Sequence, residues 1–206
     1  MDPVSAPAIE FGVTTQTIPG QRQSGDLYLV QEFPGGVLVA AVDGLGHGKE
    51  AAAAAAIAVA TLGSHAREPV DALVRRCHEE LLATRGVVMS LASLRAADQT
   101  MTWLGVGNVE GLLLRAAPQE DGPDEPLLLR RGLVGDRLPA HLRPSLIRVG
   151  PGDTLVLTTD GIESDFTQAM YRGDPPQRIA DRILSQCYKG IDDALVLVAR
   201  YLGCRP

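Results

Sequence analysis

The chain has 206 residues, a net charge of −6, 45% hydrophobic residues and 21% charged residues. This composition excludes a disordered chain and a membrane class, and the length suits one sizeable core, so we expect a single domain over residues 1–206. No basic stripe interleaved with aromatic residues is present, which argues against a nucleic-acid partner.

Cysteine usage and the N-terminus both indicate a cytoplasmic protein. The three cysteines are odd in number, widely spaced and without a C-x-x-C pair, which is typical of thiols in a reducing compartment. Residues 1–5 are not basic, and no apolar run of the kind found in a signal peptide follows them. We therefore expect a cytoplasmic protein with no membrane partner.

The first part of the chain predicts a β-hairpin followed by two helices. Three strand-like segments rich in β-branched and aromatic residues come first: residues 9–18, 26–33 and 37–42. Pro34-Gly35-Gly36 supplies a turn between the last two of them. Residues 48–65 are rich in alanine with almost no polar face, which predicts a buried helix. The amphipathic pattern of residues 70–84 predicts a second helix that covers the first.

The rest of the chain predicts a run of strands, one helix and a closing strand. The strand-like segments are residues 87–96, 101–106, 109–115, 127–130, 153–159 and 194–201, and the helix covers residues 176–187. Turns at residues 97–99 and 107–108 predict that the first three of these strands form an antiparallel meander. The acidic, proline-containing residues 118–126 predict an exposed loop. The grouped strands and helices predict an α+β layered domain, with sheets covered by helices.

Aspartates stand at the ends of the predicted strands. Asp43 and Asp160 each follow an apolar strand, the pair Asp192-Asp193 opens the last strand, and Asp26 begins the second. Because strand ends lie on the rim of a sheet, carboxylates from distant parts of the chain can converge there, where their mutual repulsion requires a cation. An all-oxygen site suits Mg²⁺ or Mn²⁺, whereas zinc prefers histidine and cysteine.

A simpler interpretation exists for each of these aspartates taken singly. An Asp-Gly pair such as Asp43-Gly44 is also typical of a plain turn after a strand, and an acidic pair before a strand is a common cap. Their joint pattern favours a shared metal site. The glycine after the aspartate permits a tight turn, which at Gly44 allows a main-chain carbonyl to face a metal.

Four segments, in this order, resemble the metal-dependent protein phosphatases (PPM, or type 2C) in their SpoIIE-like bacterial branch. They are Ser24-Gly25-Asp26, Val42-Asp43-Gly44-Leu45-Gly46-His47-Gly48, Gly150-Pro151-Gly152-Asp153-Thr154-Leu155 with Thr158-Thr159-Asp160-Gly161, and Asp192-Asp193-Ala194. The resemblance implies a layered α-β-β-α sandwich of antiparallel sheets flanked by helices. It also implies a protein serine/threonine phosphatase that uses two divalent cations, Mn²⁺ or Mg²⁺.

The resemblance also implies a role for each matching residue. Asp43 would bridge the two metals, and the Gly44 carbonyl would bind one of them. Asp160 and Asp192 would complete the second metal site, and Asp26 would act near the metals directly or through water. A shift of one residue in the alignment with the family motif would make Asp193 the ligand in place of Asp192. Asp43 and Asp160 would act in catalysis through a metal-bound water molecule, which the metals activate. No covalent phosphoenzyme would be needed.

Within this branch the chain is most similar to the feedback phosphatases of the bacterial stressosome, because it is a bare catalytic domain that contains Gly105-Val106-Gly107-Asn108-Val109. This likeness implies phosphorylated STAS-domain proteins of the stressosome as substrates and partners, and we expect a monomer. The branch commonly carries an Asn-Ala-Gly-His-like stretch where this chain has residues 107–110, so a catalytic role for Asn108 does not carry over.

The phosphate contact and the proton donor are less defined by the sequence. Arg22, four residues before Asp26, is a candidate for bidentate contact with phosphoryl oxygens, and Lys49 is a weaker one. His47 is a candidate general acid, although it is offset from the family's histidine. All three residue types are also common on solvated loops.

Two other kinds of phosphate site do not match the sequence. Residues 44–50 do not form a nucleotide-binding P-loop, because one residue is missing between the glycines and a glutamate replaces the metal-binding hydroxyl. A haloacid-type phosphatase needs Asp-x-Asp, whereas Leu45 occupies the third position. A non-catalytic module that binds phosphorylated proteins and a small-molecule phosphoesterase stay open as alternatives.

Overall fold

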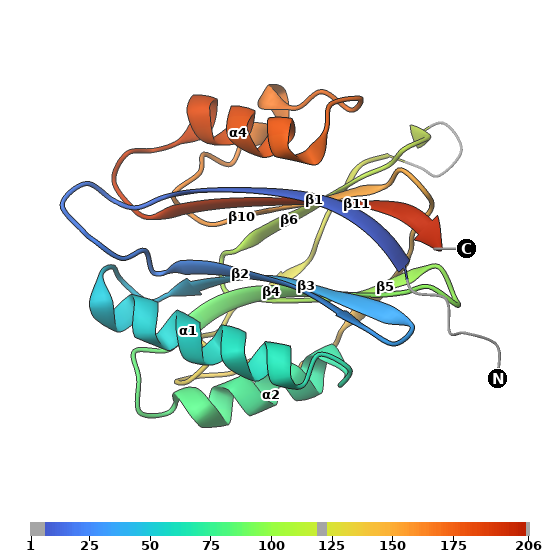
Figure 1. The fold of residues 1–206 in the computed structure, drawn as a ribbon. Coiled ribbons are helices and arrows are strands. Elements are labelled where there is room, and N and C mark those ends of the chain that lie inside the picture. The colour runs from blue at the N-terminus through green and yellow to red at the C-terminus, as the bar shows by residue number, and fades with distance from the viewer. Residues whose placement is uncertain (1–6, 119–122, 205–206) are drawn as a thin grey trace.

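Two β-sheets lie face to face between helical layers (Figure 1), in a computed structural model that describes residues 7–118 and 123–204. The first sheet has the order β1 (Pro7–Gln16), β11 (Ala194–Cys204), β10 (Thr154–Thr158), β6 (Glu110–Leu114) and β7 (Glu125–Pro126). The second has the order β2 (Asp26–Phe33), β3 (Gly36–Gly44), β4 (Val87–Arg95), β5 (Thr100–Val106) and β8 (Leu129–Arg130), and β9 (Ser145–Arg148) also pairs with β5.

Helices cover the outer faces of both sheets. Helices α1 (Lys49–Ser64) and α2 (Val70–Leu81) lie on the second sheet, and α4 (Pro176–Cys187) lies on the first, after a short 3-10 helix, η1 (Phe166–Ala169). The expected α-β-β-α sandwich is therefore confirmed. No helix in the described parts of the chain is both long and apolar enough to cross a membrane.

Strand β3 shows how the layers are held together. Its side chains alternate between two cores: Leu38, Ala40 and Val42 pack with the helices, whereas Val37 and its alternate neighbours pack between the sheets. This alternation follows from the two-residue period of a strand, and burial of both faces explains the unbroken apolar run. The strand therefore ends at a defined height in the sandwich, which places Asp43 at the rim.

The alanine-rich composition of α1 permits a close approach to this rim. Ala51, Ala54, Ala55 and Ala58 are buried against the second sheet. A Cβ atom on Gly44 would lie 2.2 Å from the carbonyl oxygen of Ala51, so only glycine fits there. The first turn of α1 and the end of β3 are thus in backbone contact.

Two expectations about the strands need correction. The predicted meander is wrong at its third strand, because β6 belongs to the first sheet and pairs with β10 instead of β5. The turn at Gly107, with φ of 101°, carries the chain from one sheet to the other. The strand expected at residues 127–130 is only the two-residue β8. Of the loop expected at 118–126, residues 119–122 lie outside the described residues, as do residues 1–5.

Candidate metal centre

The predicted aspartates come together at one end of the sandwich. Asp26 and Asp43 are directly opposite each other in the register of β2 and β3. Asp160 follows β10, and Asp192 precedes β11, so both lie where these neighbouring strands of the first sheet meet the cleft. A cleft of about 540 Å³ is lined by Asp43, Asp160 and Asp192, with Asn108 beside them. The convergence expected from strand ends is thus observed for these residues.

Asp26 lies behind Asp43 and is almost fully buried, with 3% of its surface exposed. Its Oδ2 accepts a hydrogen bond of 2.6 Å from the hydroxyl of Thr159, and that hydroxyl accepts one of 2.8 Å from the backbone N–H of Leu195. Thr159 therefore joins the carboxylate of the second sheet to the backbone of the first. The aspartate is held in place by both sheets.

Mutual repulsion and burial shift the acidity of the cluster. Burial, and after it the negative charges of Asp26, Asp160 and Asp192, together raise the pKa of Asp43 from 3.8 to about 9. Burial likewise raises the pKa of Asp26 to about 7, although its hydrogen bond from Thr159 acts in the opposite direction. Without a cation, these carboxylates hold more protons at neutral pH than ordinary aspartates do.

Asp160 is the most supported carboxylate of the cleft. Its Oδ2 accepts a hydrogen bond of 2.8 Å from the side-chain amide of Asn108, and its backbone carbonyl accepts one of 2.7 Å from Lys189 Nζ. Burial and the charge of Asp192 raise its pKa, whereas Asn108 and Lys189 lower it. Asn108 therefore orients Asp160, which is a positioning role that the sequence did not indicate.

The structure distinguishes Asp192 from Asp193 by their surroundings. Asp193 is buried, and its two carboxylate oxygens accept hydrogen bonds of 2.8 and 2.7 Å from the backbone N–H groups of Ile18 and Gly25. Asp192 lines the cleft, and one of its carboxylate oxygens accepts the N–H of Asp193 at 2.8 Å. The geometry supports Asp192 as the residue that faces a cation and Asp193 as the one that fixes the loop before β2.

The other candidates from the sequence are not among the residues that line the cleft. Gly44 is buried next to Asp43, and its N–H donates to the carbonyl of Gly25 at 3.0 Å. Arg22 and His47 are exposed and are not among the residues that line the cleft, and Lys49 lines a separate hollow beside α1. The structure therefore provides no support for a phosphate contact from Arg22 or Lys49.

The donor set fits hard divalent cations in its chemistry. The acidic side chains that meet around Asp43 are those of Asp26, Asp160 and Asp192, and burial together with their charges raises the pKa of Asp43. Within residues 7–118 and 123–204, no three acidic, histidine or cysteine side chains converge closely enough to hold an ion as they stand.

A larger hollow, of about 690 Å³, lies elsewhere and lacks this chemistry. It is lined by Asp98, Arg115 and Arg148, among others, around the turn at the opposite end of β4. A single exposed aspartate beside two arginines has no need of a metal ion. The smaller acidic cleft is therefore the candidate site.

The two-sheet sandwich and the acidic cleft at its rim define a PP2C-type phosphatase domain. The family profile described as Stage II sporulation protein E (SpoIIE) matches residues 34–202, and the chain belongs to this family. The family and the fold expected from the sequence are both confirmed.

Three relatives show how far the similarity extends. Phosphoserine phosphatase RsbX of Bacillus subtilis (strain 168) is 21% identical over 182 residues, which is 88% of this chain and 89% of RsbX. A crystal structure of RsbX with magnesium has a TM-score of 0.82 at 22% identity, over 94% of this chain and 95% of that one. A solved chain described under the bacterial stressosome, a modular system, has a TM-score of 0.84 at 29% identity, over 94% of this chain and 100% of that one. A structure of the PP2C phosphatase domain of SpoIIE from Bacillus subtilis, with a fragment of its regulatory domain, has a TM-score of 0.78 at 19% identity, over 98% of this chain and 65% of that one.

Proposed function

We propose that this protein hydrolyses phosphoserine or phosphothreonine on bacterial signalling proteins, with two divalent cations, Mn²⁺ or Mg²⁺, held in the acidic cleft. The observation that carries the proposal is the uncompensated cluster of Asp26, Asp43, Asp160 and Asp192 at the meeting point of the two sheets. Membership in the SpoIIE family and the likeness to a phosphoserine phosphatase support the same reaction.

The roles of the residues follow from their positions. Asp43, Asp160 and Asp192, which line the cleft, would hold the cations, and Asp26 would support Asp43 from behind. The carbonyl of Gly44 is included as a ligand because the family resemblance implies it. Divalent cations supply a Lewis acid there and activate a water molecule for in-line attack on phosphorus. Asn108 keeps the carboxylate of Asp160 in position through the bond at 2.8 Å.

As substrates we propose phosphorylated STAS-domain proteins of the stressosome, which the resemblance to stressosome phosphatases supports. Leu45, Val88 and Leu133 line the same cleft as the aspartates, so an apolar wall is available to a polypeptide beside its phosphorylated residue. A single domain, a monomer and a cytoplasmic location belong to this proposal.

A non-catalytic phosphoprotein-binding module fits the cleft less well. Four neighbouring carboxylates repel a phosphate group unless cations intervene. Their burial also destabilises the fold, and binding of a phosphorylated protein does not require such a cluster. A small-molecule phosphoesterase would use the same aspartates, and the choice of substrate separates it from a protein phosphatase.

The test is hydrolysis by the purified protein with Mn²⁺, with Mg²⁺ and with a chelator. We expect metal-dependent release of phosphate from an aryl phosphate and faster release from a phosphoserine-bearing STAS domain. Asp160→Asn should abolish both activities, whereas Asp98→Asn, an exposed aspartate at the opposite end of β4, should retain them. Hydrolysis that continues undiminished in the chelator would refute the metal-dependent mechanism, and activity on small esters alone would favour the phosphoesterase.

A further inference from the structure

A single arginine lies on the acidic cleft, in a segment that the sequence did not single out. Arg131 directly follows β8 and lines the cleft together with Asp43, Asp160 and Asp192. Its position is fixed by the preceding residue, since the carbonyl of Arg130 accepts a hydrogen bond of 2.8 Å from the N–H of Gly107. Arg131 is thereby placed next to the turn that carries Asn108.

The backbone around Arg131 is rigid. A Cβ on Gly132 would lie 2.8 Å from Pro139 and 3.0 Å from the carbonyl oxygen of Arg137, so the segment is tightly packed. Two residues further on, Val134 exchanges backbone hydrogen bonds of 2.8 and 2.9 Å with Val87 at the start of β4. The base of the arginine side chain therefore has a defined place on the rim.

The guanidinium group of Arg131 is uncommitted, in contrast to neighbouring arginines. Arg130 donates to the carbonyl of Arg143 at 2.7 Å, and Arg85 forms an ion pair with Glu50. Arg131 is exposed and makes no hydrogen bond or ion pair with any residue in the described parts of the chain. Arg131 is therefore a residue of the cleft lining whose positive charge has no partner in the described parts of the chain.

We propose that Arg131 binds the phosphoryl group of the substrate in the cleft that the aspartates line. The inference rests on the proposed phosphatase function and names the residue that fulfils the role first considered for Arg22. A phosphate monoester dianion carries oxygens that a planar guanidinium contacts in pairs, and a fixed arginine recognises them with more directional specificity than a lysine does. A cleft that is lined by an unpaired arginine and by carboxylates able to hold cations matches the negative charge of that group.

The test compares Arg131→Ala and Arg131→Lys with Arg137→Ala, which removes an exposed charge from the same loop. We expect Arg131→Ala to lower kcat/KM about 100-fold on both an aryl phosphate and a phosphoserine peptide, as loss of a charge-stabilising donor does in other enzymes. Inhibition by inorganic phosphate should weaken about tenfold or more, Arg131→Lys should be intermediate, and Arg137→Ala should match the wild type.

Three outcomes would overturn the assignment. They are an unchanged phosphate inhibition constant in Arg131→Ala, a loss confined to peptides with acidic flanking residues, and a weakening of phosphate inhibition in Arg22→Ala instead. Calorimetric titration of inorganic phosphate into the Mg²⁺-loaded protein provides a readout without turnover. A wild type that binds phosphate through Arg131 but hydrolyses no ester would refute the proposed function and leave this inference intact.

Discussion

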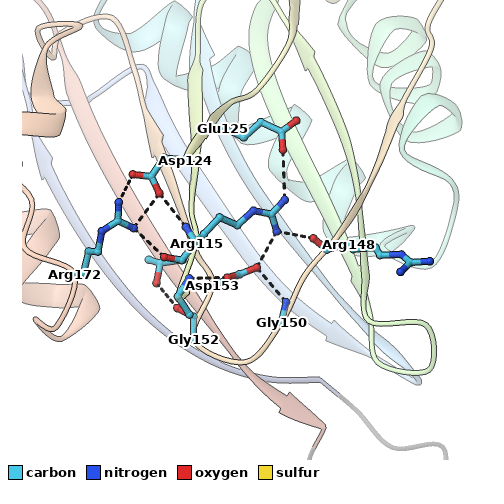
Figure 2. Close-up of polar contacts among 10 residues, drawn as sticks. Arg115, Asp124, Glu125, Arg148, Gly150, Gly152, Asp153 and Arg172 are labelled. Carbon is cyan, nitrogen blue, oxygen red and sulfur yellow. Dashed lines mark hydrogen bonds and ion pairs between the residues drawn. The ribbon is translucent and has the colours of Figure 1, made fainter. Parts of the chain in front are cut away.

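Two acidic clusters of the molecule have opposite surroundings. At one end, the cleft aspartates have no arginine bonded to them among the described residues. On another side, Asp124, Glu125 and Asp153 are joined to Arg115 and Arg172 (Figure 2), a set that we call the arginine clamp. The side chain of Asp153 is only 1% exposed, yet it accepts a bond of 3.0 Å from Arg115 and two more from backbone N–H groups.

The difference teaches how burial of a carboxylate can be used. In the arginine clamp each buried negative charge meets a positive one, and the result is a tie between β6, β10 and the segment before α4. In the cleft, burial and like charges raise the pKa values of Asp26 and Asp43. Carboxylates that are paired with arginines stabilise the fold, whereas a cluster of unpaired carboxylates favours the binding of cations.

The largest effect should come from the cleft. Asp43→Asn removes a proposed bridging ligand, so we expect kcat/KM with Mn²⁺ or Mg²⁺ to fall by at least 10³-fold, about 4 kcal/mol. The same substitution removes a strained carboxylate, so thermal unfolding in a chelator should occur at an equal or higher temperature. Full activity in this variant would contradict the assignment of Asp43, and a lower melting temperature would contradict the electrostatic strain.

A substitution in the arginine clamp should lower the stability of the protein, in contrast to one in the cleft. Asp153→Ala leaves the buried Arg115 without its closest carboxylate, so we expect the free energy of unfolding in urea to fall by about 3 kcal/mol. The matched control is Glu125→Ala, which removes the half-exposed partner of the same arginine and should cost about 1 kcal/mol or less. Equal costs for the two variants would show that burial of the pair is not what matters.

A further expected effect is a pH dependence of stability without metal. Asp26 and Asp43 have pKa values of about 7 and about 9 in the folded protein, against 3.8 as the reference value. Between these limits the folded state binds more protons than the unfolded state, so the free energy of unfolding should decrease as pH rises from about 4 to about 9. Urea unfolding in a chelator measures this slope.

Two controls separate this slope from other titrations. Asp43→Asn should flatten the upper part of the slope, between about pH 7 and pH 9, because the residue with the higher pKa is gone. Saturating Mg²⁺ should flatten the slope in the wild type, since the cation replaces the protons. A slope that is unaffected by both changes would locate the titrating groups elsewhere.

Local patterns in the sequence predicted much of the fold. The bounds of β2 and α4 agree with the expected ranges 26–33 and 176–187, because a turn and a helix-starting proline mark their ends. The sequence predicted a loop where the two-residue β7 lies, and a strand over residues 127–130 of which only the two-residue β8 is present, since segments so short carry no periodicity. The sheet to which β6 belongs was predicted wrongly, because pairing depends on where Gly107 directs the chain.

The sequence predicted which aspartates form the site, but it could not predict the contacts that hold them or the other residues that line the cleft. Strand ends indicate where carboxylates gather, and Asp43, Asp160 and Asp192 do lie on one cleft. The bond from Thr159 to Asp26 joins residues 133 positions apart, and no local pattern encodes such a contact. Arg131 follows a strand of two residues, so only the folded chain shows that it reaches the cleft.

The alternation along β3 also limits how this protein can change over evolutionary time. A deletion of one residue between Gly36 and Asp43 would turn every following side chain to the opposite face, which would place the helix-facing set between the sheets and aim Asp43 away from the cleft. Deletions of two residues would preserve the parity. Lineages of this domain should therefore vary the length of the β2–β3 hairpin in even steps, with odd changes confined to the turn beyond Phe33.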